Sequence, residues 1–154
     1  MDPVEQINRE VQGKVNGLGT EIIRFGEEKK RILARTDLPD DAKTGMIESA
    51  REALVGHMET IFGEADGSIN QDIDGIVEAC SGQAVRQIDR VRKAAGVWRR
   101  ELPDLRRFLE YCAEMIEEHP GELSPEIQKS QKCVTEATVV LERITSRVEL
   151  EVKT

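Results

Sequence analysis

The sequence predicts an all-α protein, an elongated antiparallel bundle of about four to five helices with coiled-coil-like heptad packing. Every apolar series long enough to judge recurs at steps of three or four residues, which is the period of a helix and not of a strand. Charged residues make up 34% of the 154 residues, as is typical of long exposed helices. Aromatic residues make up only 3%, so we expect an aliphatic core in one domain over residues 1–154.

The first helix is expected over residues 3–35. Its apolar residues form one stripe, at Val4, Ile7, Val11, Val15, Leu18, Ile22, Phe25, Ile32 and Leu33. The stretch VQGKVNGLGT holds three glycines, but it lacks the residues that a phosphate-binding Walker loop or a dinucleotide fingerprint requires. Gly13 and Gly17 fall on the face opposite the stripe. We expect that face either to let a second helix approach closely or to be a solvent-exposed, locally flexible part of the helix.

A second helix is expected over residues 39–62, after a stop near residue 35. Asp37 is expected to cap it, with Pro39 in its first turn and acidic residues near its positive end. Its apolar side carries Ile47, Ala50, Leu54, Met58 and Ile61. The turn GEADGS follows, and Ser68 with Gln71 resembles a capping box that opens the next helix.

The longest element is expected to be a helix over residues 68–119, kinked near Pro103. Its apolar residues alternate steps of three and four in a heptad seam, at Ile88, Val91, Ala95, Trp98, Leu102, Leu105, Leu109, Cys112 and Ile116. Because this seam continues across Pro103, we expect a kinked or briefly broken helix and not two unrelated ones. The position of Trp98 within the seam predicts a core residue.

The last helix is expected over residues 125–150, after the stretch HPGELS. Ser124 is expected to cap it and Pro125 to occupy its first position. Its apolar residues recur at sevens, with two more between them, at Ile127, Val134, Ala137, Leu141, Ile144 and Val148.

The segment from Asn70 to Ser81 partly matches a calcium-binding loop. Asn70, Asp72, Asp74 and Gly75 stand at the first, third, fifth and sixth positions, but Ser81 stands where calcium needs a bidentate glutamate. The isoleucines between these residues also fit a helical stripe, and acidic residues early in a helix favour its macrodipole. We therefore expect a helix here, with no bound metal and no cofactor.

The cysteines and histidines form no recognisable reactive site. Cys80, Cys112 and Cys133 lie far apart, which is typical of buried free thiols in a reducing compartment. His57 and His119 show neither zinc-ligand spacing nor a nearby nucleophile motif, and His57 is expected to be a packing residue. No enzymatic activity is expected.

Charge is distributed unevenly along the third expected helix. Residues 83–107 are rich in cations, at Arg86, Arg90, Arg92, Lys93, Arg99, Arg100, Arg106 and Arg107. The following stretch is acidic, with glutamates that include Glu110, Glu114, Glu117 and Glu118. These charges could pair with neighbouring antiparallel helices, make complementary contacts between subunits, or bind a phosphate backbone.

These observations favour a non-catalytic interaction or assembly protein that acts through helix faces as a homo-oligomer, such as a small subunit or adaptor of a larger complex. Its partners would be itself and another protein, contacted through Gly13, Gly17 and the charged residues above. The alternative is a nucleic-acid-associated protein using the surface from Arg86 to Arg107, which the net charge of −8 disfavours. No apolar run reaches the length of a membrane span, and the polar, acidic first residues do not resemble a signal peptide. A cytoplasmic location, or assembly from a cytoplasmic pool, is expected.

Overall fold

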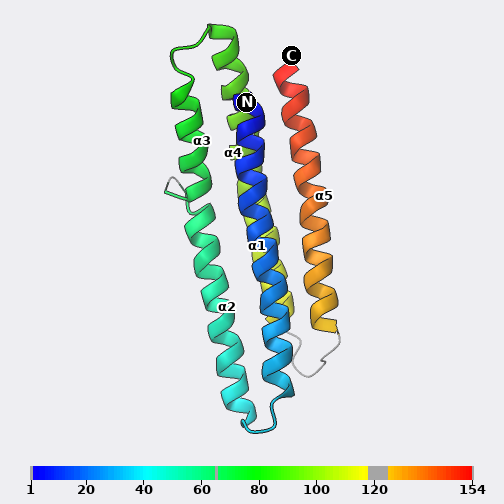
Figure 1. Cartoon of the computed structure of the whole chain (residues 1–154). Coiled ribbons are helices and arrows are strands. Elements are labelled where there is room, and N and C mark those ends of the chain that lie inside the picture. The colour runs from blue at the N-terminus through cyan, green and yellow to red at the C-terminus, as the bar shows by residue number, and fades with distance from the viewer. Residues whose placement is uncertain (1, 65, 118–124, 154) are drawn as a thin grey trace.

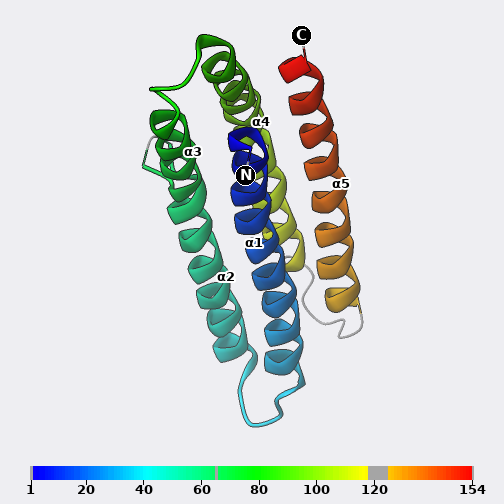
Figure 2. The same cartoon turned by 45° about the horizontal axis from the view of Figure 1, so that its top comes forward.

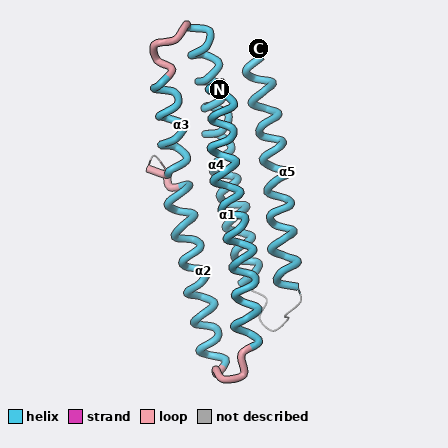
Figure 3. The backbone as a smooth tube through the Cα atoms, viewed as in Figure 1, coloured by secondary structure: helices cyan, strands magenta, loops and turns pink. Residues whose placement is uncertain are grey.

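The computed structural model describes residues 2–64, 66–117 and 125–153, with side chains from residue 128 onward in the last segment. It confirms the all-α fold, since this part of the chain forms helices and no strand. The helices are α1 (Pro3–Ala34), α2 (Asp40–Phe62), α3 (Ser68–Ala79), α4 (Val85–Glu117) and α5 (Pro125–Lys153). Figure 3 shows that the loops lie at the ends of the bundle and at the break between α2 and α3.

The helices form four rods, because α3 continues in the direction of α2 (Figure 1). The chain runs down α1, up α2 and α3, down α4 and up α5, so that rods consecutive in the chain are antiparallel, whereas α1 and α4 run parallel. In the described chain α1 and α4 contact each other and every other helix, whereas α5 contacts neither α2 nor α3. The α2–α3 rod and α5 therefore lie on opposite sides of a central α1–α4 pair, as Figure 2 also shows.

The two predicted apolar series meet in the core of the bundle. In the α1 stripe all residues are buried except Leu33, which is partly buried. In the α4 seam all are buried except Ile88, which is half-buried. Trp98 is fully buried, and its indole Nε1–H donates a hydrogen bond of 2.8 Å to the side-chain oxygen of Asn8 on α1. The residues of the α4 seam are thus buried by contacts within the chain and are not available to a partner.

The helix expected over residues 68–119 is two helices, and its break does not fall at Pro103. The chain turns at residues 80–84, where the backbone N–H of Gln83 donates a hydrogen bond of 3.0 Å to the Cys80 carbonyl. Pro103 lies inside α4 on its exposed side. An exposed proline can be accommodated there because water can hydrate the Arg99 carbonyl that loses its donor.

Two expected helix caps are also wrong. The carboxylate of Asp37 does not cap α2 but accepts hydrogen bonds from the Arg35 guanidinium at 2.6 and 3.0 Å. Gly67 precedes α3 without a side-chain cap, so Ser68 does not form the expected capping box, and Gln71 instead donates to the Asp66 carbonyl at 3.0 Å. At α1, Asp2 does cap, since its carboxylate accepts the Val4 amide at 3.1 Å. The expected cap at Ser124 lies outside the described residues.

Candidate interaction surfaces

The outer face of α1 carries the two glycines that the sequence singled out. Gly13 and Gly17 are exposed, and a Cβ placed on either would have no heavy atom within 4 Å. The close helix approach in this chain occurs instead at Gly19, where a Cβ would lie 3.4 Å from a methyl carbon of Val134 on α5. The Gly13–Gly17 face is therefore open in the single chain.

A groove of about 800 Å³ lies between α1 and α2, and we call it the acidic groove. Phe25, Ala50 and Leu54 contribute apolar lining, and Met46 remains 39% exposed. The α2 wall is a row of small residues spaced by three and four, at Ala42, Gly45, Ser49 and Ala53. This spacing places them on one side of the helix, so a second helix could lie close to the α2 backbone.

The charges around this groove are mainly negative. Glu21 and Glu28 line it from α1, and only Arg24 among its lining residues is a cation. Glu48 and Glu52 are exposed on α2 but are not among the residues that line the groove. The lining therefore carries two carboxylates and one guanidinium.

The groove was not identified from the sequence, and neither was the contact between His57 and one of its lining residues, Glu21. The row of small residues was visible in the spacing of Gly45, Ser49 and Ala53, but exposed small residues produce no apolar period. His57 was expected to pack at the edge of the apolar face. It is instead an exposed residue whose Nδ1 contacts the Glu21 carboxylate.

Many of the α4 cations that the sequence marked as interaction residues are paired within the chain. Arg90 contacts Asp2 at 3.4 Å, and Arg100 contacts Glu151 at 2.6 Å. Arg99 contacts Asp74 on α3, and Arg107 contacts Asp104 one turn away at 3.2 Å. The pairs of Arg99 and Arg100, with α3 and α5, match the explanation in which the charges pair with neighbouring antiparallel helices, whereas Arg107 pairs within its own helix.

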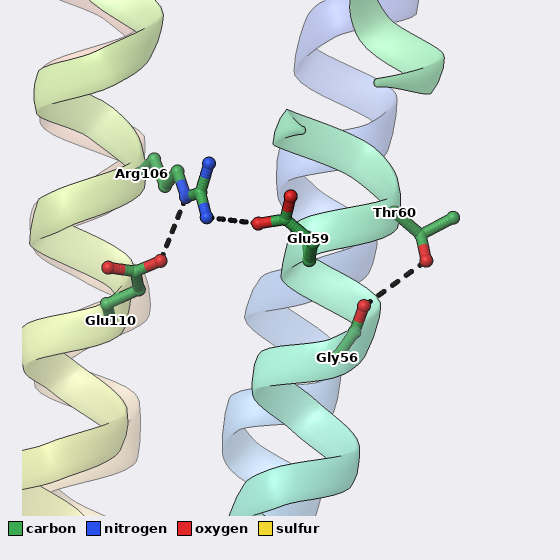
Figure 4. Close-up of polar contacts among 5 residues, drawn as sticks. All are labelled: Gly56, Glu59, Thr60, Arg106 and Glu110. Carbon is green, nitrogen blue, oxygen red and sulfur yellow. Dashed lines mark hydrogen bonds and ion pairs between the residues drawn. The ribbon is translucent and has the colours of Figure 1, made fainter. Parts of the chain in front are cut away.

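Arg106 forms the most connected of these pairs, as Figure 4 shows. Its guanidinium contacts Glu59 across on α2, and its Nε donates to Glu110 on the same helix at 2.9 Å. The hydrogen bond to Glu110 is the main reason that the pKa of Arg106 is raised. In the same view the Thr60 hydroxyl donates to the Gly56 carbonyl at 3.2 Å. This network joins α2 to α4 along the outside of the bundle.

Some of the remaining charged residues that the sequence singled out are paired within the chain and others are not. Glu117 contacts Arg51 on α2, whereas Glu114 is exposed with no ion pair in the described chain. Glu118 lies outside the described residues. Near the start of α4, exposed cations have no ion pair with any described residue, namely Arg86, Arg92 and Lys93. The uneven charge of α4 is therefore partly neutralised, and its unpaired charges include three cations near its start and Glu114 near its end.

The partial calcium-loop match lies within helix α3. Asp72 forms an ion pair with Lys14 on α1, and Asp74 pairs with Arg99. In the described chain no group of three or more histidine, cysteine, aspartate or glutamate residues could hold a metal ion.

Two buried polar features lie in the core; the sequence predicted buried thiols but not the contact between Cys112 and Cys133, and it did not predict the burial of Lys29. Lys29 is 1% exposed, and its Nζ donates to the Ile116 carbonyl and, at 3.3 Å, to the Glu117 carbonyl at the end of α4. Cys112 and Cys133 are buried and share a hydrogen bond between α4 and α5, which together with burial raises the pKa of Cys112. The signal for Lys29 was its place in the α1 stripe between Phe25 and Ile32.

No protein-family model matches this chain, and no curated protein or solved structure matches it either. No helix in the described chain is long and apolar enough to cross a membrane.

Proposed function

We propose that this protein is a non-catalytic interaction or assembly protein that works through its helix faces and associates with copies of itself. The acidic groove is the observation that supports this function most. It is an open furrow with apolar lining, a wall of small residues and charges beside it, and these features suit a helix of another molecule. We expect the protein in the cytoplasm, since its cysteines Cys80, Cys112 and Cys133 are all free thiols.

The energy of such an association would have to come from the exposed faces of the bundle. The α4 seam is buried within the chain, and surface ion pairs contribute only about 0–1 kcal/mol each. Close packing against the small residues of α2, together with burial of Met46 and the groove lining, is the available source. The open face at Gly13 and Gly17 lies farther along α1, on the same side of the helix as Arg24.

Nucleic-acid binding through the surface from Arg86 to Arg107 is the weaker candidate. Arg90, Arg99, Arg100 and Arg106 already contact carboxylates of other helices, which lowers the positive potential available to phosphates. Retention on a heparin column that falls steeply with salt would favour this candidate over self-association.

Light scattering coupled to size-exclusion chromatography tests the proposal directly. We expect the measured mass to rise above the 17.3 kDa of one chain as the concentration increases from low to high micromolar at low salt. A mass that stays at one chain over this range would show that the protein does not associate with itself.

A further inference from the structure

Two of the three cysteines meet at the contact between α4 and α5. Cys112 belongs to the buried α4 seam, and Cys133 is buried near the start of α5. Their thiols share a hydrogen bond, so the two sulfur atoms are neighbours although they belong to different helices. Cys80 is also buried, but it lies at the turn after α3, at the opposite end of the bundle from the start of α5 (Figure 1).

The fold itself brings these two cysteines to one level of the bundle. Because α4 and α5 contact each other and are antiparallel, the late part of α4 lies beside the early part of α5. At the other end of this contact, Arg147 on α5 pairs with Glu101 on α4 at 2.6 Å. The ion pair and the two thiols therefore mark the two ends of one helix contact.

The α4–α5 contact is narrow where the thiols lie. Ser130 and Ala137, each one turn from Cys133, are small buried residues, whereas the buried residues farther along α5 include Leu141 and Ile144. The distance between packed helices depends on the size of the side chains at their contact, so α4 and α5 can approach most closely at this level. A disulfide bond requires such closeness, since it joins residues whose Cα atoms are about 4.4–6.8 Å apart.

We infer that Cys112 and Cys133 are a redox pair, which the disulfide of a small thiol such as glutathione oxidises to a disulfide bond that joins α5 to α4. This inference does not depend on self-association. The bond would close a loop of roughly 20 residues, and a cross-link of this kind stabilises a protein mainly by restricting its unfolded chain. The oxidised protein would therefore hold α5 on the bundle more firmly than the reduced protein does.

The reaction consists of two thiol–disulfide exchanges. The hydrogen bond with Cys112 lowers the pKa of Cys133, so the Cys133 thiol loses its proton first and attacks glutathione disulfide. A bond forms between Cys133 and one glutathione sulfur, and the other glutathione leaves as a thiolate. Cys112 then loses its proton and attacks the Cys133 sulfur, which releases the second glutathione. The two cysteines lose two hydrogen atoms in total, and one glutathione disulfide is reduced to two glutathione molecules.

Burial controls the rate of this reaction. The reagent reaches the thiols only during local separations of α4 and α5, so the first exchange is slow. When the helices pack together again, they place Cys112 beside the mixed disulfide on Cys133. The second exchange is then intramolecular and fast, and little of the mixed disulfide should accumulate.

Mass spectrometry and thermal denaturation of the whole chain test this pair. The folded protein is incubated with glutathione disulfide, its remaining thiols are alkylated, and it is digested with trypsin, which cleaves after Lys129 and Lys132 and so separates the two cysteines. We expect a linked pair of peptides that contain Cys112 and Cys133, with Cys80 alkylated. Circular dichroism should show that the oxidised protein melts about 5–10 °C above the reduced protein.

Variants of each cysteine provide the controls. Cys80→Ser retains the pair and should form the same link with the same rise in melting temperature. Cys112→Ser and Cys133→Ser each remove one partner, so neither should show a rise on oxidation. The oxidised and reduced samples of one variant are compared with each other, which cancels the effect of serine itself. Cys112→Ala and Cys133→Ala replace these variants if a buried hydroxyl prevents folding.

Three results would refute the redox pair. The first is a wild type without the linked peptides after an incubation that fully oxidises the same chain in urea. The second is a link from Cys80 to either of the other cysteines that forms as fast as the expected one. The third is a linked protein that melts no higher than the reduced protein, because the bond would then fail to stabilise the contact between α4 and α5.

Discussion

At the residue scale, Lys29 is the one charged side chain that is fully buried in the described chain. Its ammonium binds carbonyls at the last turn of α4, where helical carbonyls lack intrahelical donors and the helix dipole favours a cation. A residue on the α1 stripe thereby stabilises the end of the α4 helix. Its methylene stem fills the position that an apolar residue would occupy.

We predict that Lys29→Ala lowers the free energy of unfolding by about 2–4 kcal/mol, since it removes buried methylenes and leaves carbonyls without donors. Lys29→Met keeps most of the volume and should cost less, about 1 kcal/mol. Urea denaturation measures both. An unchanged stability for Lys29→Ala would contradict this role.

The hydrogen-bonded thiols of Cys112 and Cys133 predict a dependence of stability on pH. The hydrogen bond to Cys133 and burial raise the pKa of Cys112 above its ordinary value of 9.0. The unfolded chain therefore loses this proton at a lower pH than the folded chain does. The stabilisation is complete below the unfolded pKa and decreases as the pH rises above it, by at most about 1.4 kcal/mol per pH unit.

Relative to Cys112→Ser, we expect the wild type to lose about 1 kcal/mol of stability between roughly pH 8 and pH 10. Urea denaturation of both proteins at several pH values measures this difference. Parallel pH profiles would show that Cys112 does not keep its proton in the folded state.

At the element scale, the glycines of α1 fall into two classes that the sequence alone did not separate. Gly13 and Gly17 lack neighbours, whereas Gly19 faces Val134 on α5. We predict that Gly13→Ala and Gly17→Ala each stabilise the protein by about 0.5–1 kcal/mol through helix propensity. Gly19→Leu should destabilise it by about 1–3 kcal/mol, because the side chain would enter the α1–α5 contact.

Gly13→Leu serves as the control for the size of the introduced side chain, since that position is open. Thermal denaturation by circular dichroism distinguishes the variants. Equal effects of leucine at positions 13 and 19 would contradict the packing of Gly19 on Val134.

Pro103 supports a second prediction about a single helix. It lies inside α4 and cannot donate to the Arg99 carbonyl. We predict that Pro103→Ala stabilises the protein, by up to about 3 kcal/mol, because it restores a hydrogen bond and helix propensity. A loss of stability in urea denaturation would indicate that the core packs against a bend that the proline creates.

At the scale of the whole molecule, the sequence predicted the helical rods but not where they break or which side chains of neighbouring rods contact one another. The stripes of α1 and α4 have a helical period because one side of each helix is buried, so the sequence predicted which of their residues form the core. The turn at residues 80–84 was missed because Ile76, Cys80 and Ile88 continue apolar spacing across it. The ion pairs of Arg99 and Arg106 depend on how helices align in space, which periodicity does not encode.

The arrangement of the rods around the α1–α4 pair has a consequence for how the native molecule opens. Since α5 touches neither α2 nor α3 in the described chain, each side can detach while the other stays in place. Slow exchange of backbone amides with deuterated water reports such partial opening events. We expect the amides of α5 to exchange as one group, distinct from those of α2. Gly19→Leu should speed exchange in α5 and leave α2 unchanged, whereas equal acceleration in both would show that the molecule opens only as a whole.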